Sequence, residues 1–321
     1  MIGYRRTLAL WALLCAGIAP TAILANEEKF TVQCKSDDGF LHVYSDHPVD
    51  PARCKAIAAR ATKTFAFVTD RAEWKDRGLL TAKPLEFALV GDNAHNVLGY
   101  AKGPNLMVMK DSYMDNPLSE GTLAHELTHI EDLRQLRGKK LPSFMLEGRA
   151  LTIGQAYRLS IGQTPGDYDR QMARSAVNFT ADQAMGLLDN YGGHGWDNQA
   201  IGTVVVEYMR TQWKGGIPDI NPRLSRMIER VAAGREFDQA FQDEFGVSSE
   251  AFAADFAAYL RATQGDAKRR LQGTMWQSVA LDGPGKSQGG SSKSMADEVA
   301  DAVADAVVDR AVNEALDELL D

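Results

Sequence analysis

The chain has 321 residues, of which 45% are hydrophobic and 24% are charged, and its formal net charge is −8. Such a chain can bury one large core or two modest ones. The mild negative charge argues against nucleic acid as a partner. The charge is also unevenly placed, because residues 295–321 carry nine acidic side chains and one basic one. The rest of the chain is therefore close to neutral.

The N-terminal segment has the layout of a secretory signal peptide. Arg5 and Arg6 precede an apolar run from Leu8 to Ala19, and small residues follow. The run is about a dozen residues long, whereas a helix that spans a bilayer needs about 20. We expect cleavage after Ala25, export to a bacterial periplasm or the cell exterior, and no stable membrane insertion afterwards. An uncleaved membrane anchor is the competing interpretation.

Two cysteines remain after that cleavage, Cys34 and Cys54. An even pair in an exported protein favours a disulfide over a metal site, because the compartment is oxidising. The bridge would connect the first strand to the first helix. Two unpaired buried thiols are the alternative.

The first elements in chain order predict a small mixed sheet. Residues 29–46 hold two β-rich runs around the turn pair Asp38-Gly39, a pattern typical of a β-hairpin. The helix that follows begins with Asp50 as N-cap and Pro51 at its first position. Two more strands, separated by a loop with glycine and proline, are predicted at residues 84–91 and 105–110.

The later elements are helical. Residues 119–138 predict a helix that Ser119 can cap, and residues 143–160 predict a second helix after a break at 139–142. Three more helices are predicted at residues 198–213, 222–234 and 249–263. A sheet followed by helices indicates the α+β class.

The chain is predicted to have five parts. They are a signal peptide (1–25), an N-terminal α/β part (26–118), a helical part (119–275), a flexible linker (276–294) and an acidic amphipathic helix (295–321). The last helix has a thin apolar stripe that includes Val299, Val303 and Val307. We expect it to form fully against a protein partner or a second copy. A weak coiled coil and a solvated tail are the alternatives.

The motif His125-Glu126-Leu-Thr-His129 contains side chains that can bind a metal ion and transfer protons. Histidines four residues apart lie on one helical face, and neutral imidazole binds zinc with a Zn–N bond of about 2.1 Å. Glu126 is rotated by about 100° from His125, so it can face the open position on the metal. There it can take a proton from water and later deliver it to a leaving amine. A chance match on a surface helix is the alternative.

A third ligand is needed, because two histidines do not complete a catalytic zinc site. Gln135 occupies the position where one known arrangement has a further His or Asp, so that arrangement fails. Asp132 is either an acceptor for an imidazole N–H or a solvated surface acid. Glu147, on the next helix, would return to His129 if the small Gly148 lets the two helices approach closely. An ordinary glutamate in the first helical turn is the alternative for Glu147.

H-E-L-T-H, followed by L-E-G-x-A with 17 residues between His129 and Glu147, resembles the gluzincin metallopeptidases of the thermolysin-like superfamily. The second motif is most similar to a bacterial group with P-x-x-x-x-E-G-x-A. In this family two helices supply His, His and Glu to one zinc ion. Carried over by position, the resemblance implies His125, His129 and Glu147 as zinc ligands and Glu126 as general base.

The resemblance covers about residues 80–262 and implies further features. Residues 98–112 are similar to the strand above the family's cleft, where extended substrate pairs edge-on. Gluzincins also use a Tyr or His to stabilise the oxyanion, and Tyr191 and His194 in a glycine-rich loop are the candidates. The position where a tyrosine is expected holds Asn198.

The sequence therefore predicts an exported zinc metallopeptidase that hydrolyses a peptide or protein substrate by water attack. The first alternative is a catalytically weak or inactive, zinc-stabilised binding or assembly protein with the same fold. The second is a fold that holds no metal.

Overall fold

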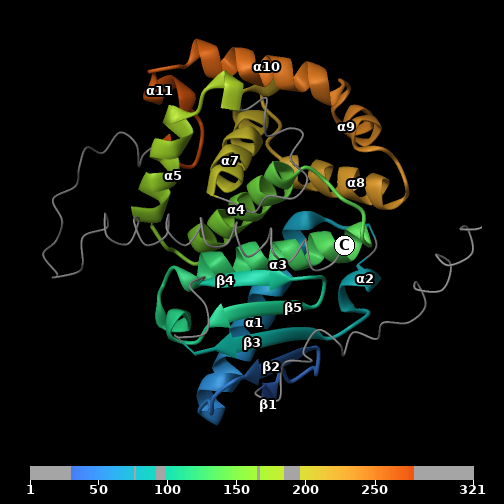
Figure 1. The fold of residues 1–321 in the computed structure, drawn as a ribbon, viewed down its shortest axis with the longest axis vertical. Helices are drawn as coiled ribbons and strands as arrows, with labels where there is room; N and C mark the ends of the chain where they lie inside the picture. The colour runs from blue at the N-terminus through green and yellow to red at the C-terminus, as the bar shows by residue number, and fades with distance from the viewer. Residues whose placement is uncertain (1–29, 76, 92–97, 165–166, 184–195, 278–321) are drawn as a thin grey trace, which may run out of the picture.

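The computed structural model describes residues 30–75, 77–91, 98–164, 167–183 and 196–277 (Figure 1). The predicted signal peptide and acidic helix lie outside these residues, as does nearly all of the predicted linker. Tyr191 and His194 lie outside them as well. No helix in the described ranges is long and apolar enough to cross a bilayer.

The described N-terminal part is built on a five-stranded mixed sheet of order β1-β2-β3-β5-β4. Its outer pairs β1–β2 and β4–β5 are antiparallel, and the inner pairs β2–β3 and β3–β5 are parallel. The strands are β1 (Thr31–Lys35), β2 (Leu41–Ser45), β3 (Leu85–Val90), β4 (Gly99–Lys102) and β5 (Leu106–Lys110). The predicted hairpin is confirmed, and Gly39 in its turn has a φ of 70°, which glycine adopts without strain.

β4 corrects a prediction, because its residues were expected in a loop. Tyr100 pairs with Val108 and Ala101 with Met107, so the strand lies at the edge of the described sheet beside β5. The strand has four residues and begins at Gly99. A strand this short has too few residues to show a recognisable alternation, so its pairing with β5 decides its conformation.

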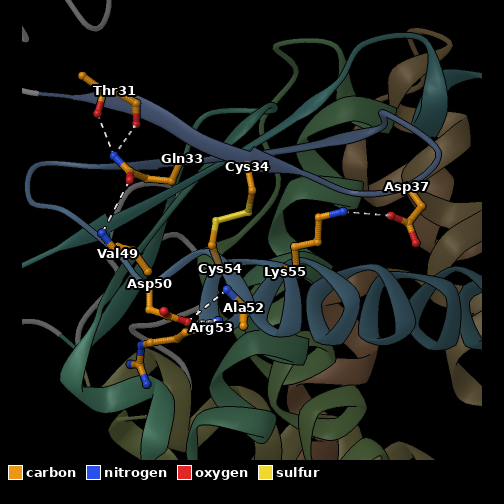
Figure 2. Close-up of a disulfide and its surroundings, with 10 residues drawn as sticks. All are labelled: Thr31, Gln33, Cys34, Asp37, Val49, Asp50, Ala52, Arg53, Cys54 and Lys55. Carbon is orange, nitrogen blue, oxygen red and sulfur yellow. Dashed lines mark hydrogen bonds and ion pairs between the residues drawn. A yellow bond between two sulfur atoms is a disulfide. The ribbon is translucent and has the colours of Figure 1, made fainter.

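Helix α1 (Pro51–Ala72) packs behind the sheet (Figure 1). Asp50 caps it as predicted, because its Oδ1 accepts from the backbone N–H of Ala52 at 3.0 Å and of Arg53 at 2.9 Å. The Cys34–Cys54 disulfide joins β1 to α1 (Figure 2), which confirms that prediction. A bridge across 20 residues restricts the unfolded chain and stabilises the fold by about 3 kcal/mol.

The chain after β5 is helical, which confirms the α+β class. The short helix α2 (Gly78–Thr81) precedes β3. The described elements after β5 are η2 (Ser112–Asp115), α3 (Ser119–Leu136), α4 (Ser143–Ser160), α5 (Asp167–Asn178), α7 (Trp196–Thr211), η3 (Trp213–Gly215), α8 (Ile220–Ala232), α9 (Phe237–Phe245), α10 (Ser249–Ala262) and α11 (Ala267–Arg270). The main core is continuous from the sheet through α3 and α4 into the later helices.

Two predicted details at α3 and α4 are wrong. Ser119 does not cap α3, since the N-cap position is Leu118 and the Ser119 hydroxyl instead accepts a hydrogen bond from Arg60 at 2.9 Å. Gly148 does not face α3. A Cβ at Gly148 would strike the backbone of Gly202 in α7, so Gly148 allows α4 to approach α7 closely.

Candidate metal centre

Helix α3 lies between the sheet and α4, and most of its residues are buried (Figure 1). This placement puts the whole H-E-x-x-H motif inside the protein. His125 and Glu126 are each 8% exposed, and His129 is 9% exposed. A chance match on a surface helix is therefore not what the structure shows.

The two imidazoles meet edge to face. Their Nε2 atoms are 2.9 Å apart, and the rings are inclined at 86°. The turn after α3 brings α4 back beside them, with Arg137 and Gly138 in left-handed conformation. Glu147 Oε2 then lies 3.3 Å from His125 Nε2 and 3.5 Å from His129 Nε2. One nitrogen from each histidine and one carboxylate oxygen thus converge on one point.

These distances test whether the residues fit a metal ion. Four ligand atoms placed tetrahedrally at about 2.1 Å from zinc are separated from one another by roughly 3.4 Å. The observed separations of 2.9, 3.3 and 3.5 Å lie around that value. A hydrogen bond between the imidazoles also accounts for the shortest distance. The residues could hold a metal ion, and two histidines with one carboxylate leave a fourth position open.

Glu126 and Glu147 occupy different places around the imidazoles. Glu126 also belongs to the buried group that could hold a metal, together with both histidines. Its Oε1, however, is 3.9 Å from His125 Nε2, which is farther than Glu147 Oε2 lies. Its Oε2 accepts the backbone N–H of Ala101 in β4 at 2.8 Å. Glu126 is therefore drawn toward the edge strand, while Glu147 faces both imidazoles.

Asp132 and Glu131 are buried behind the motif. Asp132 is fully buried and ion-paired with Arg149, so the prediction of a solvated surface acid is wrong. Burial raises the pKa of Asp132 to about 6, and the nearby Arg149 and His129 limit the rise. Burial likewise raises the pKa of Glu131 to about 7, against hydrogen bonds from Thr69 and Trp74. Arg149 was not predicted from the sequence, although an arginine between the small residues Gly148 and Ala150 of "LEGRAL" is a signal for it.

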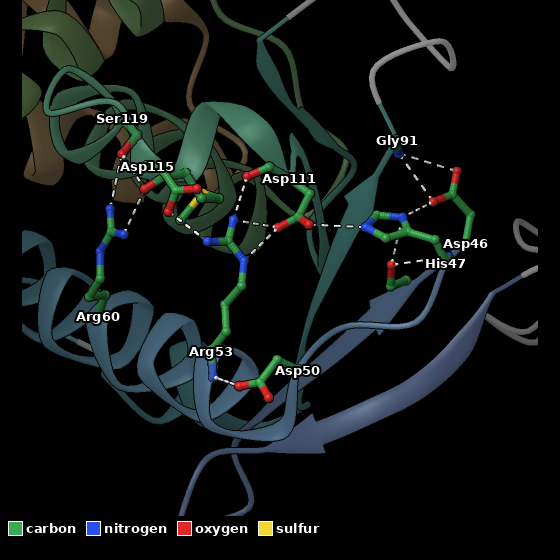
Figure 3. A network of polar contacts seen from close by, with 11 residues as sticks. Asp46, His47, Asp50, Arg53, Arg60, Gly91, Asp111, Asp115 and Ser119 are labelled. Carbon is green, nitrogen blue, oxygen red and sulfur yellow. Dashed lines mark hydrogen bonds and ion pairs between the residues drawn. The ribbon is translucent and has the colours of Figure 1, made fainter.

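A second polar network surrounds the segment that connects β5 to α3 (Figure 3). His47 follows β2, and its two ring nitrogens lie 2.6 Å from Asp46 Oδ1 and 3.0 Å from Asp111 Oδ2. Arg53 in α1 donates to Asp111 Oδ1 at 2.8 Å and to Asp115 at 2.6 Å. Because Asp111 and Asp115 connect β5 to α3, these contacts fix the start of the motif helix.

The predicted oxyanion role of Tyr191 and His194 is not tested by the described residues. Tyr191 and His194 lie outside the described residues. Asn198 is in helix α7, but the position of its side chain is not among the described features. Their role stays a prediction.

No family model matches the chain, and no curated protein matches it. Among the solved structures that match is a functionally unknown conserved protein mutant from Bacillus anthracis str. Ames. It is 10% identical, with a TM-score of 0.35, and the match covers 75% of this chain. The match covers 54% of that protein, so this chain spans about half its length. A likeness this low supports no argument about fold or function.

Proposed function

We propose that this protein is an exported zinc metallopeptidase similar to the gluzincins. The observation that supports it most is the convergence of His125, His129 and Glu147 from two adjacent helices, with Glu126 beside them. These three residues would hold the ion, because two imidazoles and one carboxylate suit zinc and leave one position open. Zinc at this place would supply Lewis acidity toward water and a substrate carbonyl.

Glu126 would do the proton transfer. Its Oε1 is directed toward the imidazoles, while Oε2 is held by the Ala101 N–H. A carboxylate in this position can take a proton from the attacking water and release it to the leaving amine. β4 is the edge of the described sheet, so an extended peptide could pair beside Glu126. The buried surroundings of α3 keep the charge on the carboxylate poorly screened.

The test is Glu126→Gln, with metal content and peptide cleavage measured on the full chain. We expect bound zinc to stay near one per chain and cleavage to fall by about 10²–10⁴-fold, because only the proton acceptor is removed. Glu120→Gln, in the first turn of the same helix, is the matched control and should keep its activity. Unchanged cleavage in Glu126→Gln would contradict the mechanism.

A zinc-stabilised binding or assembly protein is the second candidate. It is favoured by the contact between Glu126 and Ala101, which engages both the general base and an edge-strand N–H, and by the near-complete burial of the motif. In this case the protein would bind zinc and cleave none of a diverse peptide set. The acidic segment 295–321 would supply the contact to a partner or a second copy, and deleting residues 290–321 would abolish that contact.

Export is part of the proposal. The Cys34–Cys54 disulfide is consistent with an oxidising compartment such as the periplasm. A zinc site made of His and Glu has no thiol to lose by oxidation there, which suits the same compartment.

A further inference from the structure

Arg149 and Asp132 form an ion pair in the interior, between α4 and α3. Their side chains are each 1% exposed, and Arg149 Nη1 donates to Asp132 Oδ1. The guanidinium also lies over the ring of Trp74, 4.8 Å from its centroid, and donates to Ser225 Oγ in α8 at 3.3 Å. A buried charge pair is costly to desolvate and often adds no net stability. In some proteins such a pair serves instead to fix one arrangement of the elements that it joins.

The pair sits on the same two helices as the three residues of the candidate metal centre. Asp132 is three residues after His129 on α3, and Arg149 is two residues after Glu147 on α4. Neighbouring turns of a helix move together, with a rise of about 1.5 Å per residue. A sliding of α4 along α3 that separated Arg149 from Asp132 would therefore also change the reach of Glu147 to the imidazoles.

We propose that Asp132 and Arg149 are a positioning pair, which holds α4 in register with α3 so that Glu147 meets His125 and His129. The proposal rests on the proposed zinc site. Ser225 in α8 and Trp74, which lies two residues after the end of α1, also contact the guanidinium, so the register is tied to α8 and to the segment that follows α1.

The experiment measures zinc affinity by chelator competition and the unfolding midpoint of the zinc-free protein. Removing one partner would leave an uncompensated buried charge, so the main variant is the double substitution Asp132→Leu/Arg149→Met, which removes both charges and keeps apolar volume. We expect its zinc affinity to fall by about 10–100-fold, as for other groups that orient ligands. Its zinc-free unfolding midpoint should change little. Arg149→Lys keeps the charge and loses the planar guanidinium, so its zinc affinity should lie between those of the double variant and the wild type.

Arg270→Met is the matched control. Arg270 is also 1% exposed, but it donates to backbone carbonyls that include those of Phe179 and Leu260, at the ends of other helices. Its loss should lower the unfolding midpoint and leave zinc affinity unchanged. The positioning role is overturned if the double variant binds zinc as the wild type does, or loses affinity only in step with stability. A wild-type protein that binds no zinc would overturn the proposed metal site itself. A wild-type protein that binds zinc, together with a double variant of equal zinc affinity, would overturn only the positioning role.

Discussion

His47 shows how a single residue joins distant segments at the carboxyl ends of parallel strands. Both of its ring nitrogens face carboxylates, those of Asp46 and Asp111. Hydrogen bonds to these two groups raise the pKa of His47, because they favour the charged imidazolium. Burial alone would raise the pKa of Asp111, but the contacts with His47 and Arg53 lower it, so Asp111 stays ionised in mild acid.

We predict that His47→Gln destabilises the fold more at pH 5.5 than at pH 9. The folded pKa lies above the unfolded value of about 6.5, so the stabilisation is full below pH 6.5 and is lost as pH rises through the folded pKa. About a third of the side chain is exposed, so we expect at most ~1 kcal/mol, measured by urea unfolding at both pH values. His42→Gln, in the preceding strand β2, is the matched control. An equal loss at both pH values would contradict this interpretation.

At the residue scale, the relation between residues close together in the chain could be predicted, and contacts between residues far apart in the chain could not. The spacing of His125 and His129 indicated a shared helical face, because four residues make slightly more than one turn. Nothing local indicated that Glu126 would contact Ala101 or that Arg149 would meet Asp132. Both contacts join segments that only the fold brings together.

At the scale of elements, the crossing of α4 and α7 depends on two glycines. A Cβ at Gly148 would strike Gly202, and a Cβ at Gly202 would strike the carbonyl oxygen of Phe144. The backbones can approach this closely because neither residue has a side chain. α4, which carries Glu147, is therefore packed against α3 on one side and α7 on another.

We predict that Gly202→Ala destabilises the protein by about 1–3 kcal/mol, because the added methyl group meets backbone that cannot move alone. Urea unfolding measures the effect. Gly91→Ala is the control, since a Cβ there would lie 3.9 Å from its nearest neighbours, at ordinary contact distance. A Gly202→Ala protein as stable as the wild type would show that α7 can shift without cost.

For the whole molecule, a metal ion at the candidate centre would connect α3 and α4 within the core that both helices share with the sheet. A ligand that binds only the folded state stabilises it by about 2.7 kcal/mol when present at 100 times its Kd. Metal binding and folding would then be coupled across the entire protein.

We predict that adding a chelator lowers the melting temperature of the full chain, and that zinc restores it. The double variant His125→Ala/His129→Ala should melt at a temperature that neither treatment changes, because it lacks two of the three proposed ligands. Scanning calorimetry with and without zinc measures both. If the chelator removes the metal and the wild-type melting temperature does not change, a stabilising metal site is excluded.

The sequence by itself determined the α+β class, the hairpin, the Asp50 cap, the Cys34–Cys54 pair and the spacing of the two histidines. These features follow from local backbone geometry, turn chemistry and the order of elements. Only the tertiary structure decided that Gly99–Lys102 is an edge strand, that Gly148 faces α7, and that Asp132 is buried against Arg149. Each of these depends on packing between segments far apart in the chain, where burial and close approach outweigh local preference.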